Sequence, residues 1–181
     1  GRACAEAIND AREQLAGLLG VTAEEVYFTG GGTESNNLAL KGVFLGELSF
    51  LSGHLITSQI EHPATSVPAS YLEQHGVEVT RVACDSNGFI NPAAVREAIR
   101  PNTKLVSIML ANNEVGSIQP IAEIAAICHE HGILCHTDAA QAVGKIPVDA
   151  KSLDVDMLSV AAHKFYAPKG IGAIYIADQV D

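Results

Sequence analysis

The sequence predicts an α/β fold with three layers, in which helices cover both faces of a mostly parallel β-sheet. Segments with helical spacing of apolar residues alternate with short strand-like runs along the whole chain. Most of these runs are almost continuously apolar, as expected for strands buried on both faces. With 48% hydrophobic residues, the 181-residue chain can also bury one substantial core, and we expect a single domain over residues 1–181.

The expected helices share an apolar face at three- and four-residue spacing and have ends marked by Gly or Pro. They span residues 8–18, 33–44, 63–75, 92–100 and 120–131. Gly20 follows the first of them as a stop signal, and Pro63, Pro92 and Pro120 open three of the others. Each helix therefore has a local reason to begin or to end where it does.

The expected strands are short apolar or alternating runs between these helices. They cover residues 26–29, 55–58, 77–81, 105–110, 133–137, 157–160 and 171–176. We expect the run 26–29 to be buried, whereas 77–81 alternates and should be exposed on one side. The stretch 44–51 is apolar where a polar turn would be expected, which suggests a partner contact or an unusual local fold.

Charge and cysteine content limit the classes of partner and compartment. Against 21 Asp and Glu the chain has 11 Lys and Arg, a net charge of −10, which argues against nucleic acid or an anionic membrane as the main partner. No apolar run approaches the roughly 20 residues of a membrane span. The four cysteines have no metal-finger spacing, so we expect free thiols and a reducing, cytoplasmic location. Because Gly1 is not a start Met, an N-terminal part is expected to be missing.

Polar residues follow five of the expected strands. They are Gly30, Gly31, Gly32 and Thr33, then Glu61 and His62, then Asn112, Asn113 and Glu114, then Asp138 and Gln141, and last His163 and Lys164. In an open parallel sheet, ligands bind beyond the carboxyl ends of the strands. We therefore expect these residues to converge on one edge of the sheet.

The glycine stretch at a helix start suits an anion, because backbone N–H groups can approach it and the helix dipole favours its charge. A plain tight turn is the alternative. The stretch is not a P-loop, because no Gly-Lys-Ser/Thr follows, and its spacing does not fit the dinucleotide fingerprint. Asp138, after an apolar strand, needs a positive partner or several donors; otherwise it caps a helix or accepts from the backbone.

Lys164 and the histidines also have two interpretations each. Lys164 is either a desolvated amine with a lowered pKa, as Schiff-base chemistry requires, or a surface lysine. His62 on its own is a core or capping residue, and His136 and His163 are on their own structural. A metal site built from His62, His136 and Asp138 fits no closed ligand set, so we expect no metal.

Together these residues form a more specific pattern than any of them alone. A phosphate cradle, a buried carboxylate, a histidine able to stack and a lone lysine are what pyridoxal 5'-phosphate (PLP) needs. The carboxylate would keep the ring nitrogen protonated, and the lysine would bind the aldehyde.

The chain resembles the class V aminotransferases, PLP enzymes of fold type I, and within them the NifS-like cysteine desulfurases. The matching segments run from about residue 26 to 176 and are FTGGGTESNNLALKG, ITSQIEHPA, NNEVGSIQP, HTDAAQAVGKIPVD and AHKFYAPKGIGAIYI. The segments EHPA and NNEVG are specific for the NifS-like group, although the related selenocysteine lyases share nearly all of these pieces.

The resemblance implies a role for each matching residue. Lys164 would form the Schiff base, His62 would stack on the ring, and Asp138 would pair with the ring nitrogen. Lys164 or His62 would move protons. The remaining contacts would come from Gln141 to the ring hydroxyl, Asn113 to the cofactor or substrate side, and Gly32, Thr33 and His163 to the phosphate.

The resemblance also implies a reaction and partners. L-cysteine would become L-alanine, and its sulfur would pass to an enzyme cysteine as a persulfide for iron–sulfur cluster or thio-cofactor assembly through a sulfur-acceptor protein. Family members are homodimers, so a dimer is expected for the full-length protein. There are three alternatives to this reaction. The chain could belong to a selenocysteine lyase, to an enzyme with another activity of the class V aminotransferases, or it could be a truncated fragment without catalytic activity.

The sequence departs from the family pattern at two positions and in length. Ala161 stands where a Ser usually adds a phosphate contact, and Ala167 replaces a frequent Gly in the turn after Lys164. Ala161 should weaken cofactor binding by about one hydrogen bond, ~1 kcal/mol. Ala167 would be strained if its φ is positive. Family members are much longer, so we expect residues 1–181 to be a partial PLP-binding large domain. The N-terminal segment and the C-terminal small domain, with the nucleophilic Cys and the substrate-binding Arg, would be absent.

Overall fold

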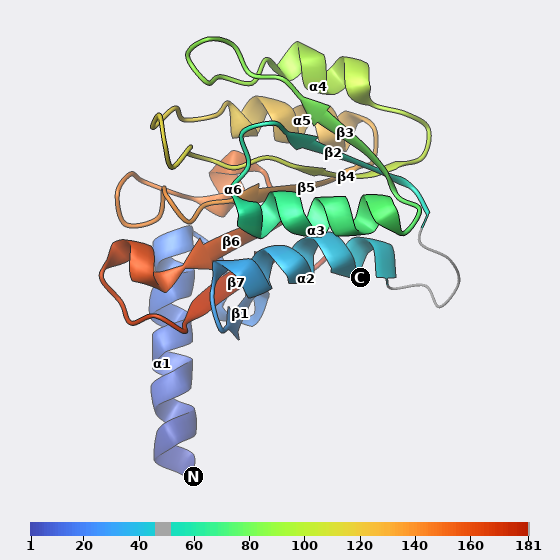
Figure 1. The fold of residues 1–181 in the computed structure, drawn as a ribbon. Coiled ribbons are helices and arrows are strands. Elements are labelled where there is room, and N and C mark those ends of the chain that lie inside the picture. Colours follow the sequence, from blue (N-terminus) through green and yellow to red (C-terminus); the bar gives the residue numbers. More distant parts are fainter. Residues whose placement is uncertain (46–51, 181) are drawn as a thin grey trace.

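The computed structural model describes residues 1–45 and 52–180. Within these residues, seven strands form one sheet in the order β1-β7-β6-β5-β4-β2-β3 (Figure 1). The strands are β1 (Val26–Thr29), β2 (His54–Ser58), β3 (Glu78–Val82), β4 (Thr103–Ser107), β5 (Leu134–Asp138), β6 (Met157–Ala161) and β7 (Gly172–Ile176). Each of them overlaps a strand that the sequence predicts.

The sheet is mostly parallel. Neighbouring strands from β3 through β2, β4 and β5 to β6 all run in the same direction. Only β7 reverses, because it pairs antiparallel with both β6 and β1. The carboxyl ends of six strands therefore lie at the same edge of the sheet.

Helices cover both faces of this sheet. They are α1 (Arg2–Leu19), α2 (Gly32–Leu45), α3 (Pro63–Gln74), α4 (Pro92–Ala98), α5 (Ile121–Glu130) and the short α6 (Ala150–Leu153), with 3-10 turns η1 (Ala23–Glu25) and η2 (Ala162–Phe165). Helices α2 and α3 pack side by side on one face (Figure 1). The buried residues of α1, α4, α5 and α6 belong to the cluster on the other face, which confirms the three-layer prediction.

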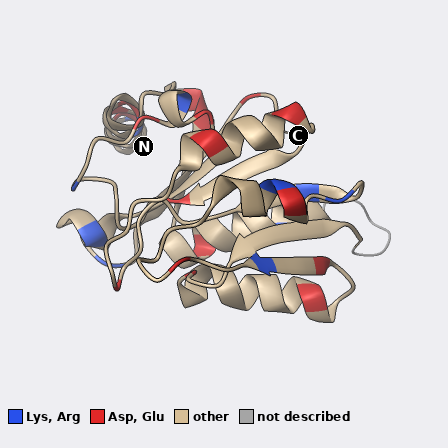
Figure 2. Ribbon diagram, turned by 90° about the horizontal axis from the view of Figure 1, so that it is seen from above, with Lys and Arg blue, Asp and Glu red and all other residues tan. Residues whose placement is uncertain are grey.

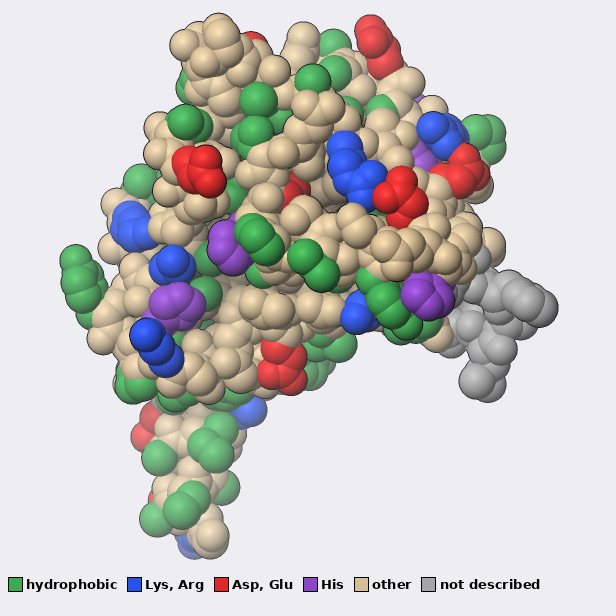
Figure 3. Space-filling model, in the orientation of Figure 1, with side chains coloured by type: hydrophobic (Ala, Val, Ile, Leu, Met, Phe, Trp, Pro, Cys, Tyr) green, Lys and Arg blue, Asp and Glu red, His purple; other side chains and the backbone are tan. Residues whose placement is uncertain are grey.

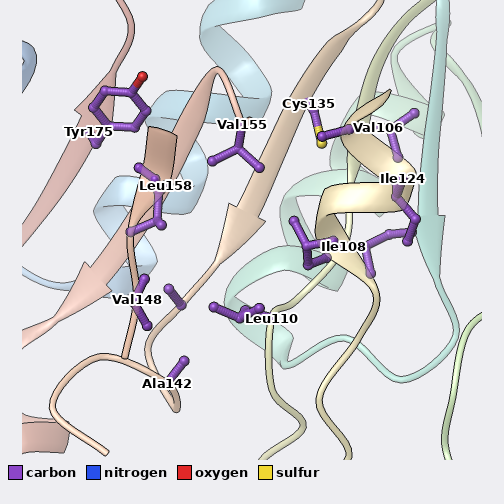
Figure 4. Close-up of a cluster of buried hydrophobic side chains, with 14 of the residues drawn as sticks. Val106, Ile108, Leu110, Ile124, Cys135, Ala142, Val148, Val155, Leu158 and Tyr175 are labelled. Atoms are coloured by element: carbon purple, nitrogen blue, oxygen red, sulfur yellow. The ribbon is translucent and has the colours of Figure 1, made fainter. Parts of the chain in front are cut away.

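Successive residues of the central strands point to opposite layers. In β2, Leu55 packs toward α2 and α3, and Ile56 packs into the cluster on the other face. Leu105 and Val106 of β4 divide in the same way. Figure 4 shows part of the larger cluster, where side chains of the sheet meet those of α5 and the loops. Because both faces are covered, consecutive residues in the middle of these strands are apolar, as the sequence shows.

Acidic residues occur on several elements of the part of the chain that the structure describes (Figure 2). Asp and Glu are spread over several helices and loops in Figure 2. Helix α1 extends away from the body of the molecule, and exposed apolar side chains are visible along it in Figure 3. None of the helices in the described ranges combines the length and the apolar character needed to cross a bilayer.

Two of the strand predictions need correction. Strand β1 is not buried, because it lies at the sheet edge, where Tyr27 and Phe28 are 51% and 40% exposed. Of the run 105–110, β4 itself ends at Ser107, although the N–H groups of Ile108 and Leu110 still donate to β5 (3.2 and 2.9 Å). The N–H of Met109 donates to the Glu61 carboxylate (3.0 Å). Of the odd stretch 44–51, residues 46–51 lie outside the described residues.

The glycine loop after β1 lies against the start of β7 with almost no space between the two backbones. A Cβ on Gly172 would lie 2.6 Å from the carbonyl carbon of Gly31 and 2.7 Å from the carbonyl oxygen of Val160. Backbone atoms cannot move aside as a flexible side chain can. The close approach of the glycine loop to β7 therefore requires a residue without a side chain at Gly172.

Replacing Gly172 with Ala should destabilise the protein by about 1–3 kcal/mol through overpacking. Urea unfolding followed by circular dichroism measures the change. The control is Gly17→Ala in α1, where an added Cβ meets nothing within 4 Å and should be neutral or stabilising by up to about 1 kcal/mol. Equal stability of Gly172→Ala and the wild type would contradict this account of the loop.

Candidate active site

A cavity of about 740 Å³ opens at the carboxyl edge of the sheet. It is lined by all eight residues that the sequence and the resemblance single out, namely Gly32, Thr33, His62, Asn113, Asp138, Gln141, His163 and Lys164. They come from loops after β1, β2, β4, β5 and β6, so the parallel topology brings distant segments together. Glu61, Asn112 and Glu114, which the sequence places at the same edge, are not among the residues that line it.

The glycine loop forms one wall of the cavity and leads into α2, which begins at Gly32. A Cβ on Gly32 would lie 3.1 Å from the Cβ of Ala161, so this turn packs closely on the end of β6. The carboxylate of Glu34 accepts a hydrogen bond from the N–H of Gly30 (2.5 Å). The helix start, with its free N–H groups and positive dipole end, faces the cavity as an anion site would require.

Asp138 is the last residue of β5 and is 6% exposed. Its Oδ1 accepts from the backbone N–H of Ala140 (2.9 Å), and its Oδ2 accepts from Nδ2 of Asn36 (2.7 Å). Burial raises the pKa of this carboxyl above its usual value. The two hydrogen bonds and the positive charge of Lys164 act in the opposite direction and favour the anion.

His62 combines two of the roles considered for it. Its Nδ1 accepts from the N–H of Ala64 (3.1 Å), so the residue caps α3 ahead of Pro63. This bond leaves the proton of the neutral ring on Nε2. His62 also lines the cavity, and the cap fixes the position of its ring there.

Lys164 lies on η2, directly after β6, and lines the same cavity as Asp138 and His62. Its side chain is exposed, which agrees with the second of its two interpretations, a surface lysine. The exposure follows from position, because η2 lies in the connection between β6 and β7, beyond the edge of the sheet. The positive φ of this turn is 71° at Tyr166, so Ala167 does not carry the strain that the family comparison suggested.

Other polar residues at this edge stabilise the loops. Asn112 is buried, and its Oδ1 accepts from the N–H groups of Glu114 and Val115, which holds the turn that presents Asn113. Gln141 accepts from Nζ of Lys145 (2.5 Å) and still lines the cavity.

His136 is fully buried away from this cavity. Its two ring nitrogens bond to Ser107 (2.8 Å) and Ser159 (2.9 Å), and burial lowers its pKa to about 3. It is structural, as expected for it alone. Within the described ranges, no three His, Cys, Asp or Glu side chains are grouped as metal ligands would be.

Sequence reasoning missed the role of two polar residues, the buried Asn36 and the half-buried Glu61. Glu61 Oε1 accepts from Ser58 Oγ (2.5 Å) and from the N–H of Met109, while its Oε2 is buried without a partner. Burial, and to a smaller degree the charge of Asp138, raises the pKa of Glu61 to about 8. For Asn36 there was a signal, because it shares the predicted buried helix face with Leu40, four residues later.

Comparisons with known proteins agree on one family. The family profile described as "Aminotransferase class-V" matches residues 1–181. Cysteine desulfurase IscS of Dictyoglomus turgidum is 50% identical over 176 residues, which are 97% of this chain and 44% of that protein. The mitochondrial cysteine desulfurase of Arabidopsis thaliana is 47% identical over 170 residues, 94% of this chain and 37% of that protein.

Solved structures give the same result. The structure titled "SspA in complex with cysteine" matches with a TM-score of 0.95 and 46% identity over 98% of this chain and 51% of that one. A "NIFS-LIKE PROTEIN" matches with a TM-score of 0.90 and 41% identity over 95% of this chain and 47% of that one. The chain thus spans about half the length, or less, of the relatives it matches.

The raised pKa of Glu61 predicts how the free energy of unfolding depends on pH. Between about pH 4.5, where an unfolded Glu titrates, and about 8, the folded state keeps a proton that the unfolded state has released. The free energy of unfolding should therefore fall as pH rises through this range. Glu61→Gln mimics the protonated acid and should remove this decline.

Urea unfolding at several pH values tests this expectation. Wild type and Glu61→Gln should be similar at low pH, and near pH 8.5 the variant should be more stable by about 1–4 kcal/mol. Glu123→Gln, at an exposed position of α5, controls for the loss of one charge. If the wild-type and Glu61→Gln stabilities run parallel across pH, Glu61 does not hold the proton.

Proposed function

Because this chain belongs to the class V aminotransferase family, we propose that it forms the cofactor-binding core of a PLP-dependent cysteine desulfurase. One observation carries the proposal: Lys164, Asp138, His62 and the glycine loop line one cavity. A primary amine, a buried carboxylate, an imidazole and a helix start are the groups that hold an aromatic aldehyde phosphate. The relatives named cysteine desulfurase support the choice of reaction.

The residues present fit PLP on chemical and steric grounds. The cavity volume of about 740 Å³ is in the range of cofactor sites. Gly32 has no side chain and so leaves space at the helix start for the phosphate. A Cβ added to Gly32 would lie 3.1 Å from the Cβ of Ala161. Asp138 is a buried anion site without a cationic side chain bonded to it among the described residues, and a protonated ring nitrogen would supply that partner.

Each residue has its own part in this proposal. Gly32, Thr33 and His163 would bind the phosphate, and Lys164 would hold the aldehyde through its Nζ. His62 would pack on the ring, and Asp138 would hold the proton of the ring nitrogen. Gln141 would bind the ring hydroxyl, and Asn113 would border the substrate side. The bound cofactor supplies an electron sink that weakens bonds near the amino group of the substrate.

The proposed reaction converts L-cysteine and an enzyme thiol into L-alanine and a persulfide. The carbon–sulfur bond of the substrate breaks, a sulfur–sulfur bond forms, and the carbon that loses sulfur gains a proton. Lys164 is the base and acid closest to this chemistry, with His62 as the second candidate. Cys4, Cys84, Cys128 and Cys135 do not line the cavity, so we assign the accepting thiol to none of them.

We further propose a homodimer, a sulfur-acceptor protein that feeds iron–sulfur cluster or thio-cofactor assembly, and a cytoplasmic location. The cysteines are free, which supports a reducing compartment. The SspA structure contains cysteine, which supports a small amino-acid substrate.

A non-catalytic relative is the second candidate. It is favoured by the exposure of Lys164 and by Ala161, which removes a hydroxyl from the proposed phosphate site. Cofactor binding by the chain separates the two candidates.

Adding PLP to the wild-type chain should produce the visible absorption band of lysine-bound cofactor, and borohydride should fix the cofactor to Lys164. Lys164→Ala should lose both signals, because Lys164 is the amine that the proposal assigns to the cofactor aldehyde. Lys169 lines the same cavity, so Lys169→Ala is the matched control and should keep both signals.

Absorbance and mass spectrometry of the reduced protein are the measurements. Cofactor fixed in Lys164→Ala as in the wild type would show that the site is assigned wrongly. A wild-type chain without any band would favour the non-catalytic candidate.

A further inference from the structure

We propose that Asn36 is a positioning residue that keeps Asp138 ionised and oriented for the ring nitrogen of the cofactor. The inference rests on the proposed function and assigns a role in it to Asn36, which lies on the buried side of α2. The evidence is the geometry around the Asn36 amide, which connects three elements of the fold.

The side chain of Asn36 is completely buried, at 0% exposure. Its Nδ2 donates to Asp138 Oδ2 over 2.7 Å and to Thr65 Oγ1 over 3.0 Å. The amide thus joins α2 to the end of β5 and to the first turn of α3. The bond to Asp138 is short for an N–H···O contact, as charge-assisted bonds are.

The orientation of the amide matches an ionised carboxyl. Asn36 Oδ1 is buried without a partner, while both N–H groups of Nδ2 are used. A protonated Asp138 could donate to that oxygen if the amide turned over, and the orphaned acceptor would then be satisfied. The arrangement present instead gives two hydrogen bonds to acceptors, one of them the carboxylate of Asp138.

A neutral donor is better suited to this position than a charged one. Burial disfavours a negative charge on Asp138, while the charge of Lys164 favours it. A lysine or arginine in place of Asn36 would neutralise the carboxylate inside the protein. The amide favours the anion without neutralising it, and so leaves its charge available to a cationic ring nitrogen.

The first test separates an effect on the ring nitrogen from a general loss of structure. PLP and its 1-deaza analogue, in which carbon replaces the ring nitrogen, are titrated into wild type, Asn36→Leu and Thr65→Val. Asn36→Leu should weaken PLP binding by about tenfold, the equivalent of one charge-assisted hydrogen bond, and should change binding of the analogue less than about twofold. Thr65→Val removes the other partner of the same amide and should leave the ratio of the two affinities unchanged.

A second readout needs no cofactor. Carbon-13 NMR titration of the Asp138 carboxyl should show a higher pKa in Asn36→Leu than in wild type, and no such rise in Thr65→Val. Thermal unfolding shows whether each variant is folded, and Asn36→Ala takes the place of Asn36→Leu if that variant is not.

The outcomes distinguish this inference from the proposed function. Equal loss of PLP and of the analogue in Asn36→Leu, or an unchanged Asp138 pKa, overturns the role of Asn36 and leaves the PLP site standing. A wild-type chain that binds neither compound overturns the proposed function and, with it, any role of Asn36 toward a cofactor.

Discussion

Burial of one carboxylate, Asp138, at the end of a central strand is the constraint on which the rest of the site depends. A charge in that position is costly unless donors and positive groups surround it. The fold supplies a backbone N–H from the following turn, an amide from α2, and the positive charge of Lys164 nearby. These groups come from segments far apart in the chain, so the carboxylate is held only when the sheet and both flanking helices are assembled.

The sequence was informative where local rules govern the structure. Apolar runs identified the strands because a parallel sheet covered on both faces needs apolar residues throughout. Topology then predicted the convergence of Gly32, His62, Asp138 and Lys164, because carboxyl ends of parallel strands meet at one edge. The roles of these residues follow from the family resemblance and from chemistry, not from their positions.

What the sequence could not predict depends on long-range packing. Asn36 meets Asp138 across 102 residues of sequence, and no local pattern encodes that contact. Glu61 resembles its neighbour His62 in position, yet it turns inward to accept from Met109. Lys164 is exposed and β1 forms an edge because burial depends on which elements pack over them, and periodicity does not specify that.

The reversal of β7 has a consequence for the position of Lys164. Lys164 lies in the connection between two adjacent antiparallel strands, whose ends pair at Ala161 and Gly172. The other polar walls of the cavity are built on connections that cross to a helical layer. Substitutions confined to the connection 162–171 should therefore act on Lys164 more directly than on the glycine loop or on Asp138, which depend on packing between the sheet and its helices.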